Sequence, residues 1–389
     1  MASFPVMTTR IPTVSWPAAN ARRMARQGLI APGRPDPAHV VGTLPAAHAQ
    51  VLSAAELSVG LRTTGVTRSG VRDALWKDRT LVKTFGPRGT VHLLPMAELP
   101  LWTGALSALP AGRSPFAKDA RMTPEQVESV LAAIEDALTG AELTVDELSE
   151  AVVERAGAWA GDLVMPAFQG MWPRWRQVTH LAGHRGVLCF APDRGRKATY
   201  TRPGVVPLDG AEALDGLVRR YLYAYGPATP AHFAKWLALS PAWSAKLFAG
   251  TAARGKIERV TYEGGPAWVV AGDTDFQAEP VRGVRLLPYF DAFLVASQPR
   301  ERLFPGAAYT RALAGGQAGN FPVLLVDGIA AGVWHQRRSG RRIAVTVEPL
   351  TPLTAGRLRE LEAEVARVGA VLEGNAELTV GTVTVGAHA

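Results

Sequence analysis

The hydrophobic positions of the chain repeat one order three times: two short helical segments are followed by two strands around a turn. In the first copy, apolar spacing predicts helices over 53–61 and 67–76 and a hairpin of strands 80–85 and 90–94. The turn is Gly86-Pro87-Arg88-Gly89, and glycine and proline between alternating apolar residues are typical of a hairpin. The first copy is therefore predicted to be two helices and a hairpin.

The second copy contains two helix starts that the sequence marks clearly. Thr123-Pro124-Glu125-Gln126 and Thr144-Val145-Asp146-Glu147 are both capping boxes, in which side chains satisfy the first free backbone amides of a helix. A further helix is predicted over 172–182. A hairpin of strands 186–190 and 197–201 follows it.

The third copy repeats the same order. Helices begin at Thr229-Pro230 and Ser240-Pro241, and strands 256–262 and 267–270 turn through Glu263-Gly264-Gly265. Helix, tight turn, helix and hairpin is the winged-helix form of the helix-turn-helix. Three copies in order favour this assignment over a chance pattern.

After Phe276 the pattern changes to strands with a closing helix over 353–372, in which Glu and Arg residues recur at helical spacing. The predicted strands are 284–291 (ending in a turn), 322–326, 329–335 and 342–347. The predicted fold class is α+β, with three tandem winged-helix units followed by a β-rich C-terminal lobe with a closing helix. The predicted divisions are an N-terminal helical segment over 1–52, winged helices over 53–115, 120–205 and 210–275, and the lobe over 276–389.

Composition sets bounds on this fold. The chain has 389 residues, of which 47% are hydrophobic, so two or three domains with sizeable cores are expected. No apolar run approaches the roughly 20 residues that cross a bilayer, and the N-terminus lacks an apolar signal core. The single cysteine, Cys189, excludes an intramolecular disulfide and a cysteine-based zinc cluster, and its apolar strand predicts inert packing. We expect a cytoplasmic, nucleoid-associated protein.

Charge favours a polyanionic partner. The net charge is +8, with 42 Lys and Arg against 34 Asp and Glu, although Arg-rich composition also follows from GC-rich coding. The first forty residues hold five arginines and one acid, Asp36. A transit peptide shares this composition, but the run Ala21–Arg26 favours a basic opening helix.

The candidate chemistry begins at His48-Ala49-Gln50. In an extended backbone, side chains two residues apart point the same way, so His48 and Gln50 can converge on one small target such as a water. Imidazole accepts or donates a proton near neutral pH, and the amide offers both a donor and an acceptor. The alternative is a loop histidine and a glutamine that face solvent.

Several segments resemble one family, the AlkZ-like DNA glycosylases, which are built from tandem winged helices. The resemblance rests on 88–94 in the first wing, 186–192 in the second, and then 286–291 and 326–328, in the family's order and at similar spacing. It covers roughly residues 21–369. The family carries its active site as a Gln–aliphatic–Gln triplet just before the first winged helix. Gln50 matches this triplet and His48 departs from it.

The resemblance implies removal of guanines alkylated at N7. Such a base is cationic and leaves neutral, so no general acid is needed, and an oxocarbenium-like sugar and an attacking water remain. A neutral His48 can orient or deprotonate the water while Gln50 holds it. The triplet has no lysine to form a Schiff base, so we expect a monofunctional enzyme that leaves an abasic site. Its expected partner is double-stranded DNA carrying alkylated purines, and we expect a monomer. No cofactor or metal is expected, and no H-E-x-x-H spacing is present.

Basic residues at the predicted turns are candidate DNA contacts, because wings and basic hairpins hold phosphates or enter the minor groove. They are Arg88, Arg194, Arg196 and Lys197 at two wings, and Arg337, Arg338, Arg341 and Arg342 at one C-terminal hairpin tip. The alternative for each is a solvated turn. Trp172 and Trp175 are at a spacing that favours the core over stacking on a base.

Two other functions stay open at this point. A transcription regulator without catalysis accounts for winged helices and charge equally well, and a catalytically inactive lesion binder accounts for the histidine in the triplet. The family also includes self-resistance enzymes against DNA-alkylating natural products, and a histidine-bearing triplet resembles the members that serve bulky intercalating alkylators. Release of an N7-alkylguanine from DNA separates these alternatives.

Overall fold

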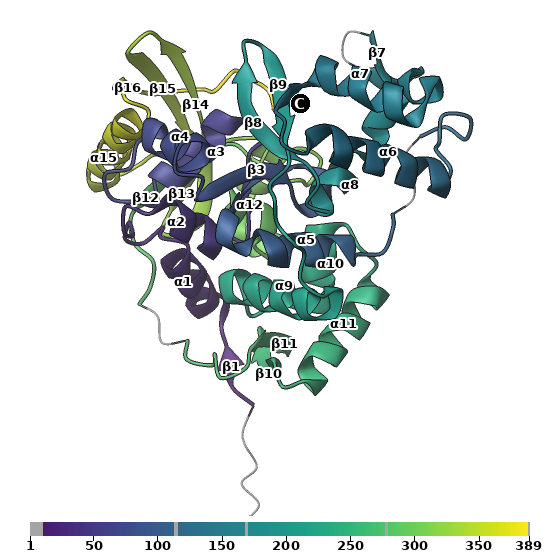
Figure 1. Ribbon diagram of the computed structural model, residues 1–389. Helices are drawn as coiled ribbons and strands as arrows, with labels where there is room; N and C mark the ends of the chain where they lie inside the picture. Colours follow the sequence, from purple (N-terminus) through teal and green to yellow (C-terminus); the bar gives the residue numbers. More distant parts are fainter. Residues whose placement is uncertain (1–10, 113–115, 168–169, 277–278, 388–389) are drawn as a thin grey trace, which may run out of the picture.

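The computed structural model describes residues 11–112, 116–167, 170–276 and 279–387, and it is a mixed α/β protein (Figure 1). Three successive segments each combine helices with a small antiparallel sheet, and a five-stranded sheet forms the C-terminal part. In the described part of the chain, no helix is long and apolar enough to cross a membrane.

The opening helix α1 (Trp16–Arg26) is present, and the side chain of Ser15 caps its first turn. Its arginines face inward. Arg23 is buried and donates to the carbonyl oxygens of Gly226, Pro227 and Gln298, while Arg22 and Arg26 both pair with Asp273. The basic charge of α1 therefore fastens this helix to later parts of the chain.

The first unit includes the short strand that carries His48. Its elements are α2 (Pro37–Thr43), β2 (Ala47–His48), α3 (Leu52–Gly60), α4 (Arg68–Trp76), β3 (Leu81–Phe85), the 3-10 turn η1 (Pro87–Gly89) and β4 (Val91–Pro95). Strand β2 pairs with β4, which makes the sheet order β2-β4-β3. The predicted helices and hairpin are confirmed, and the triplet enters the sheet of this unit. Helix α5 (Leu99–Ser107) follows and packs against the third unit.

The second unit repeats that order with an insertion. Its elements are α6 (Pro124–Leu138), β5 (Leu143–Thr144), α7 (Val145–Ala156), β6 (Leu163–Ala167), β7 (Gly170–Pro173), α8 (Thr179–His184), β8 (Cys189–Arg194) and β9 (Lys197–Thr201), with the sheet order β5-β9-β8. Both predicted capping boxes are present.

The prediction of a single helix over 172–182 is wrong. Trp172 and Pro173 end strand β7, a 3-10 turn covers Arg174–Val178, and α8 begins only at Thr179. Pro173 has an extended backbone, with ψ at 150°, so the chain turns helical only after this residue. The apolar residues recur at helical spacing, but they are divided among the end of β7, a 3-10 turn and α8.

The third unit confirms both predicted helix starts. It contains α9 (Gly210–Tyr225), α10 (Pro230–Leu237), α11 (Pro241–Ala253), β10 (Ile257–Tyr262) and β11 (Gly265–Val270). Ala228 bridges to Trp268 of β11, in the place that β2 and β5 take in the other units. Strand β1 (Thr13–Val14) adds to the far side of β10.

The C-terminal sheet contains one strand that the sequence pattern did not predict. Its order is β12 (Val284–Leu287), β13 (Val323–Val326), β14 (Ile329–Ser339), β15 (Arg342–Pro349) and β16 (Asn375–Val380). Helix α15 (Ala355–Val371) connects β15 to the parallel β16 and packs on the sheet. Three short helices between β12 and β13 were also missed: α12 (Ala292–Ala296), α13 (Arg300–Leu303) and α14 (Ala307–Arg311).

Candidate active site

Strand β2 separates the polar residues of the triplet from the apolar ones. Ala47 and Ala49 are buried in the core of the first unit, and the amide of Ala49 donates to the carbonyl of Val91 at 2.8 Å. His48 ends the strand and is half-buried, and Gln50 follows in a bend and is exposed. The burial of two small alanines thus turns both polar groups outward.

The imidazole of His48 packs against two aromatic rings. Its centroid lies 4.6 Å from that of Phe290 in a stacked arrangement, and 5.0 Å from that of His92, which approaches edge-on. The backbone amide of Gln50 donates to Nδ1 of His48 at 3.4 Å. While that bond is kept, a neutral His48 carries its proton on Nε2, and this nitrogen is a donor.

His92 is a neutral neighbour. It is buried opposite His48 in the β2–β4 pairing, and its Nδ1 lies 2.9 Å from the carbonyl oxygen of Thr90, to which a neutral ring donates. Burial, with a smaller contribution from the nearby His48, lowers the pKa of His92 well below 6.5. His92 therefore contacts His48 as an uncharged ring.

Phe290 is positioned by a buried ion pair. Asp291, the next residue, receives two hydrogen bonds of 2.8 Å from the guanidinium of Arg62, and both side chains are fully buried. Ser58 also donates to Asp291, and Asp291 caps α12. Phe290 itself has a positive φ of 54°, and its amide donates to Gly319. Arg62 on the first unit thus fixes the turn that places Phe290 on His48.

A cavity of about 460 Å³ opens beside His48 and Phe290. It lies where the first unit, helix α10 and the start of α13 meet, so it is lined by residues far apart in the sequence. Arg88 belongs to this cavity: it lies on η1 with a φ of 60° and donates to the carbonyl of Trp236 at 3.1 Å. Burial lowers the pKa of Arg88. Two further cations of the cavity, Lys235 and Arg300, were missed by sequence analysis, because nothing local in their segments marks them.

The candidate contacts of the second wing lie at the exposed β8–β9 turn. Arg194 pairs with Glu147 at 2.8 Å, and Lys197 pairs with Asp146 at 2.7 Å, both at the start of α7. Exposed pairs of this kind are weak, so both cations can exchange these partners for a phosphate at little cost. Arg196 lies between them, exposed at the tip.

The four arginines of the C-terminal hairpin are all exposed at the β14–β15 turn. Two of them already have partners: Arg338 donates to the carbonyl of Leu372 at 2.6 Å, and Arg342 pairs with Glu377 at 2.7 Å. Within the described ranges, Arg337 and Arg341 make no ion pair. The β14–β15 and β8–β9 hairpins extend from the same, upper side of the molecule in Figure 1.

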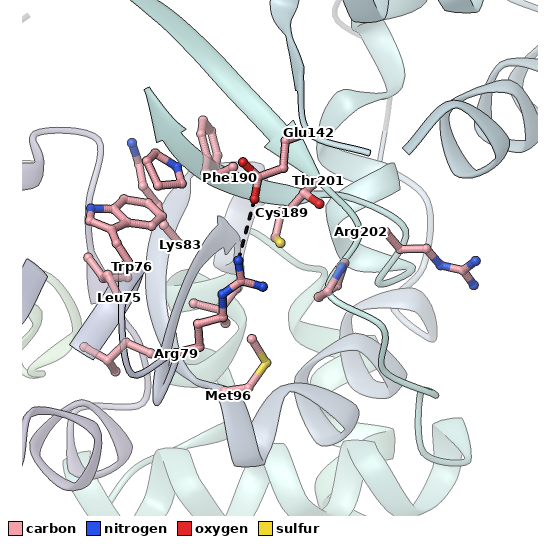
Figure 2. Close-up of a pocket in the computed structure, with 15 residues that line it drawn as sticks. Leu75, Trp76, Arg79, Lys83, Met96, Glu142, Cys189, Phe190, Thr201 and Arg202 are labelled. Atoms are coloured by element: carbon pink, nitrogen blue, oxygen red, sulfur yellow. Dashed lines mark ion pairs between the residues drawn. The ribbon is translucent and has the colours of Figure 1, made fainter. Parts of the chain in front are cut away.

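A second, smaller cavity lies between the first and second units. It has a volume of about 60 Å³, and the Arg79–Glu142 ion pair of 3.6 Å spans it, as Figure 2 shows. Burial raises the pKa of Cys189 to about 12, which makes this thiol unreactive. Trp175 is fully buried, as predicted. The prediction that Trp172 is a core residue is wrong, because it lies on the β6–β7 hairpin with its ring exposed and the guanidinium of Arg176 4.0 Å from it.

Basic residues that gather on one side of a protein are typical of proteins that bind nucleic acids. The family model described as "DNA glycosylase AlkZ-like" matches residues 41–371, and the chain belongs to this family. It is 32% identical over 333 residues to an interstrand DNA cross-link repair glycosylase of Streptomyces sahachiroi, covering 82% of this chain and 88% of the relative.

The solved structure of the Streptomyces sahachiroi DNA glycosylase AlkZ has the same fold. The two structures agree with a TM-score of 0.77 at 29% sequence identity, over 95% of this chain and 100% of the other. The protein is therefore a DNA glycosylase, a hydrolase of DNA repair, and the family inferred from the motifs is confirmed. A regulator without catalysis is not favoured.

Proposed function

We propose that this enzyme hydrolyses the N-glycosidic bond of N7-alkylated guanine in double-stranded DNA and leaves an abasic site. The observation that carries this proposal is that His48 lines a cavity with three cationic side chains, while Gln50, two residues further along, is exposed to solvent. The relative's name, an interstrand DNA cross-link repair glycosylase, supports bulky adducts or cross-links as substrates. Such a substrate needs an open site, since extruding even a normal base costs a few kcal/mol.

We infer that the chain supplies positioning more than proton transfer. Alkylation at N7 has already made the base a cationic leaving group, so the remaining task is to place a water against the oxocarbenium-like sugar. The carbonyl oxygen of the exposed Gln50 amide can accept a hydrogen bond from that water, and its NH2 group can donate one to a second oxygen. Nε2–H of His48, fixed between two rings, acts as a second donor.

This tautomer explains how histidine can replace glutamine in the family's triplet. A glutamine side chain donates through its amide nitrogen, and His48 donates through Nε2 when Nδ1 accepts from Gln50. If His48 instead accepts the water's proton at Nε2, the bond to Gln50 must break and the ring must change tautomer. We therefore propose a positioning role for His48.

The three repeated units are, in this proposal, winged helices that bind the duplex. The first then runs from α2 to β4 and contains the triplet within it, because β2 is a strand of its sheet. The exposed arginines of the two hairpins hold backbone phosphates without reading sequence. Arg88 differs from them, since it lines the cavity.

The test is single-turnover release of 7-methylguanine from a duplex that contains one such base. Gln50→Ala should lower the rate constant by at least about tenfold while DNA binding persists, given the usual size of positioning and acid–base effects. His48→Ala should also lower it, and His48→Gln should keep most of the rate, because the donor is retained. His39→Ala, at an exposed histidine of α2, is the matched control.

Wild-type rates in both alanine variants contradict the proposed site. A rate in His48→Gln as low as in His48→Ala shows that His48 transfers a proton and does not merely donate a hydrogen bond. The absence of base release by the wild-type enzyme from both methylated and bulky N7 adducts contradicts the proposed substrate class.

A further inference from the structure

The cavity beside His48 has a charge that suits an anion. Three cationic side chains line it, Arg88 from η1, Lys235 from α10 and Arg300 from α13, and no carboxylate is among its lining residues. None of the three makes an ion pair within the described part of the chain. His232, also in the lining, accepts from the Thr229 amide, and burial lowers its pKa to about 4, so it is neutral.

Arg300 is the strongest sign of a missing partner. Its side chain lies in the interior, with the residue only 6% exposed, and its Nε and Nη1 atoms have no hydrogen-bond partner. Among the residues that the structure describes, only Nη2 has a partner, in a 3.0 Å bond to the carbonyl of Val295. A buried guanidinium with unused donors is unfavourable unless an anion or a polar ligand satisfies it.

Arg88 adds to this unfavourable arrangement. It is close enough that its charge, after burial, helps to lower the pKa of Arg300. Like charges at close range in a partly buried site repel one another, and an anion between them reverses the sign of the interaction. The left-handed backbone of Arg88 and its bond to the carbonyl of Trp236 hold the guanidinium at the rim of the cavity.

The charge also excludes one occupant. An N7-alkylated guanine is cationic, and three cations without a carboxylate repel it. The phosphodiester of DNA carries one negative charge and accepts bidentate hydrogen bonds from arginine. Phosphate therefore fits the donors that line the cavity, and the base does not.

We propose that this cavity binds a backbone phosphate of the damaged strand, immediately beside the nucleotide whose base is removed. Arg88 and Arg300 grip the phosphate and Lys235 adds charge at the rim, which leaves the sugar next to His48 and Gln50. This inference rests on the proposed function, because it assigns the phosphate to the strand that the triplet attacks. Phosphate binding in the cavity would also fix the position of the sugar while a bulky base remains outside the cavity.

The test is a binding cycle that neutralises one partner at a time. Duplexes carry a stable abasic-site analogue and a single neutral methylphosphonate linkage, either next to that site or one helical turn away. Binding is measured by fluorescence anisotropy for the wild type and for Arg88→Gln/Lys235→Gln. These two side chains belong to residues exposed at the rim, so the exchange keeps Arg300 and the core intact. Lys246→Gln, at an exposed lysine of α11, is the control.

The adjacent methylphosphonate should weaken wild-type binding by about tenfold, the size of a charge-assisted hydrogen bond, and the distant one far less. In the double variant, the adjacent linkage should cause little further loss, because its partners are already gone. Lys246→Gln should keep the full tenfold difference. Additive losses in the double variant place the phosphate elsewhere and overturn the proposal.

A free anion is the competing occupant. In that case inorganic phosphate raises the melting temperature of the wild type and not that of the double variant, and DNA binding does not depend on the position of the methylphosphonate. These two results together overturn the assignment of the cavity to a DNA phosphate. The cycle uses an abasic analogue and measures no base release. It therefore remains informative if the wild-type enzyme fails to excise N7-alkylguanine.

Discussion

The buried pair of Arg62 and Asp291 can be tested by Asp291→Asn, which removes one charge and keeps the shape. Asparagine still caps α12, so the change isolates the charge. Both side chains are fully buried, and two hydrogen bonds of 2.8 Å join them. Removing one partner of a buried pair leaves an uncompensated charge, which costs about 3–5 kcal/mol of stability. We expect a loss of this size, measured by urea unfolding.

The exposed pair of Arg342 and Glu377 is the matched control, since its side chains are 70% and 57% exposed. Glu377→Gln should cost less than about 1 kcal/mol. Replacing both buried partners, with Arg62→Met and Asp291→Asn, should be less destabilising than Asp291→Asn alone, because no unpaired charge remains. The comparison separates loss of the pair from a general sensitivity to substitution.

The same variant tests the route from this pair to the active site. Loss of the anchor frees the turn that stacks Phe290 on His48, and a small displacement of a positioned group can cost up to about 10²-fold in rate. Single-turnover excision by folded Asp291→Asn should fall at least about tenfold, and the double variant should not recover it. A destabilised variant with an unchanged rate refutes the link between the pair and His48. Equal stability of Asp291→Asn and Glu377→Gln refutes the structural role of the pair.

Two other predictions concern acid and salt. Burial lowers the pKa of His184 from 6.5 to about 4, so below pH 6.5 the unfolded chain binds a proton that the folded chain refuses, and stability falls as pH falls. At pH 5 the loss of stability relative to pH 7 is about 2 kcal/mol for this group. The variant His184→Gln keeps a donor for the carbonyl of Gly86 and should reduce this pH dependence, measured by urea unfolding. The control His39→Gln should leave it unchanged. Replacing Arg337, Arg338, Arg341 and Arg342 by alanine should weaken binding to adducted DNA, measured by anisotropy, and flatten the dependence of log affinity on log salt concentration. Excision at saturating enzyme should fall far less than in Gln50→Ala. Normal binding with a loss of excision at saturation would instead place the hairpin in the active site.

Local signals in the sequence were enough for most elements of the three units. Thr123 and Thr144 begin helices because their side chains satisfy backbone amides within the same turn, and this needs no tertiary contact. Strand β16 could not be predicted that way. It follows α15 directly and is a strand because it pairs with β15, through contacts that are distant in sequence. The helix predicted over 172–182 failed for the same reason, since β6 gives β7 its partner.

Charge was the least predictable property of the fold. In the sequence, three arginines of α1 suggest a basic surface helix: Arg22, Arg23 and Arg26. In the structure they donate hydrogen bonds to backbone carbonyls of the third unit and of the segment after it. Arg88 looks like a wing contact and lines a cavity instead. Arg300 and Lys235 give no signal, because a phosphate site made from three separate turns and helices has no spacing to recognise.

In the mechanism proposed here, catalysis depends on the docking of the C-terminal lobe onto the first unit. His48 comes from β2, its edge-on neighbour His92 from β4, and its stacking partner Phe290 from the segment that follows β12. The first two share a small sheet, but Phe290 reaches them only because Arg62 of the first unit holds Asp291. The imidazole therefore has both of its ring neighbours only when the lobe is in place. The Arg62–Asp291 pair is buried where the first unit contacts the C-terminal lobe. Weakening this contact should therefore reduce the excision rate more than it reduces DNA binding, which depends on the exposed arginines.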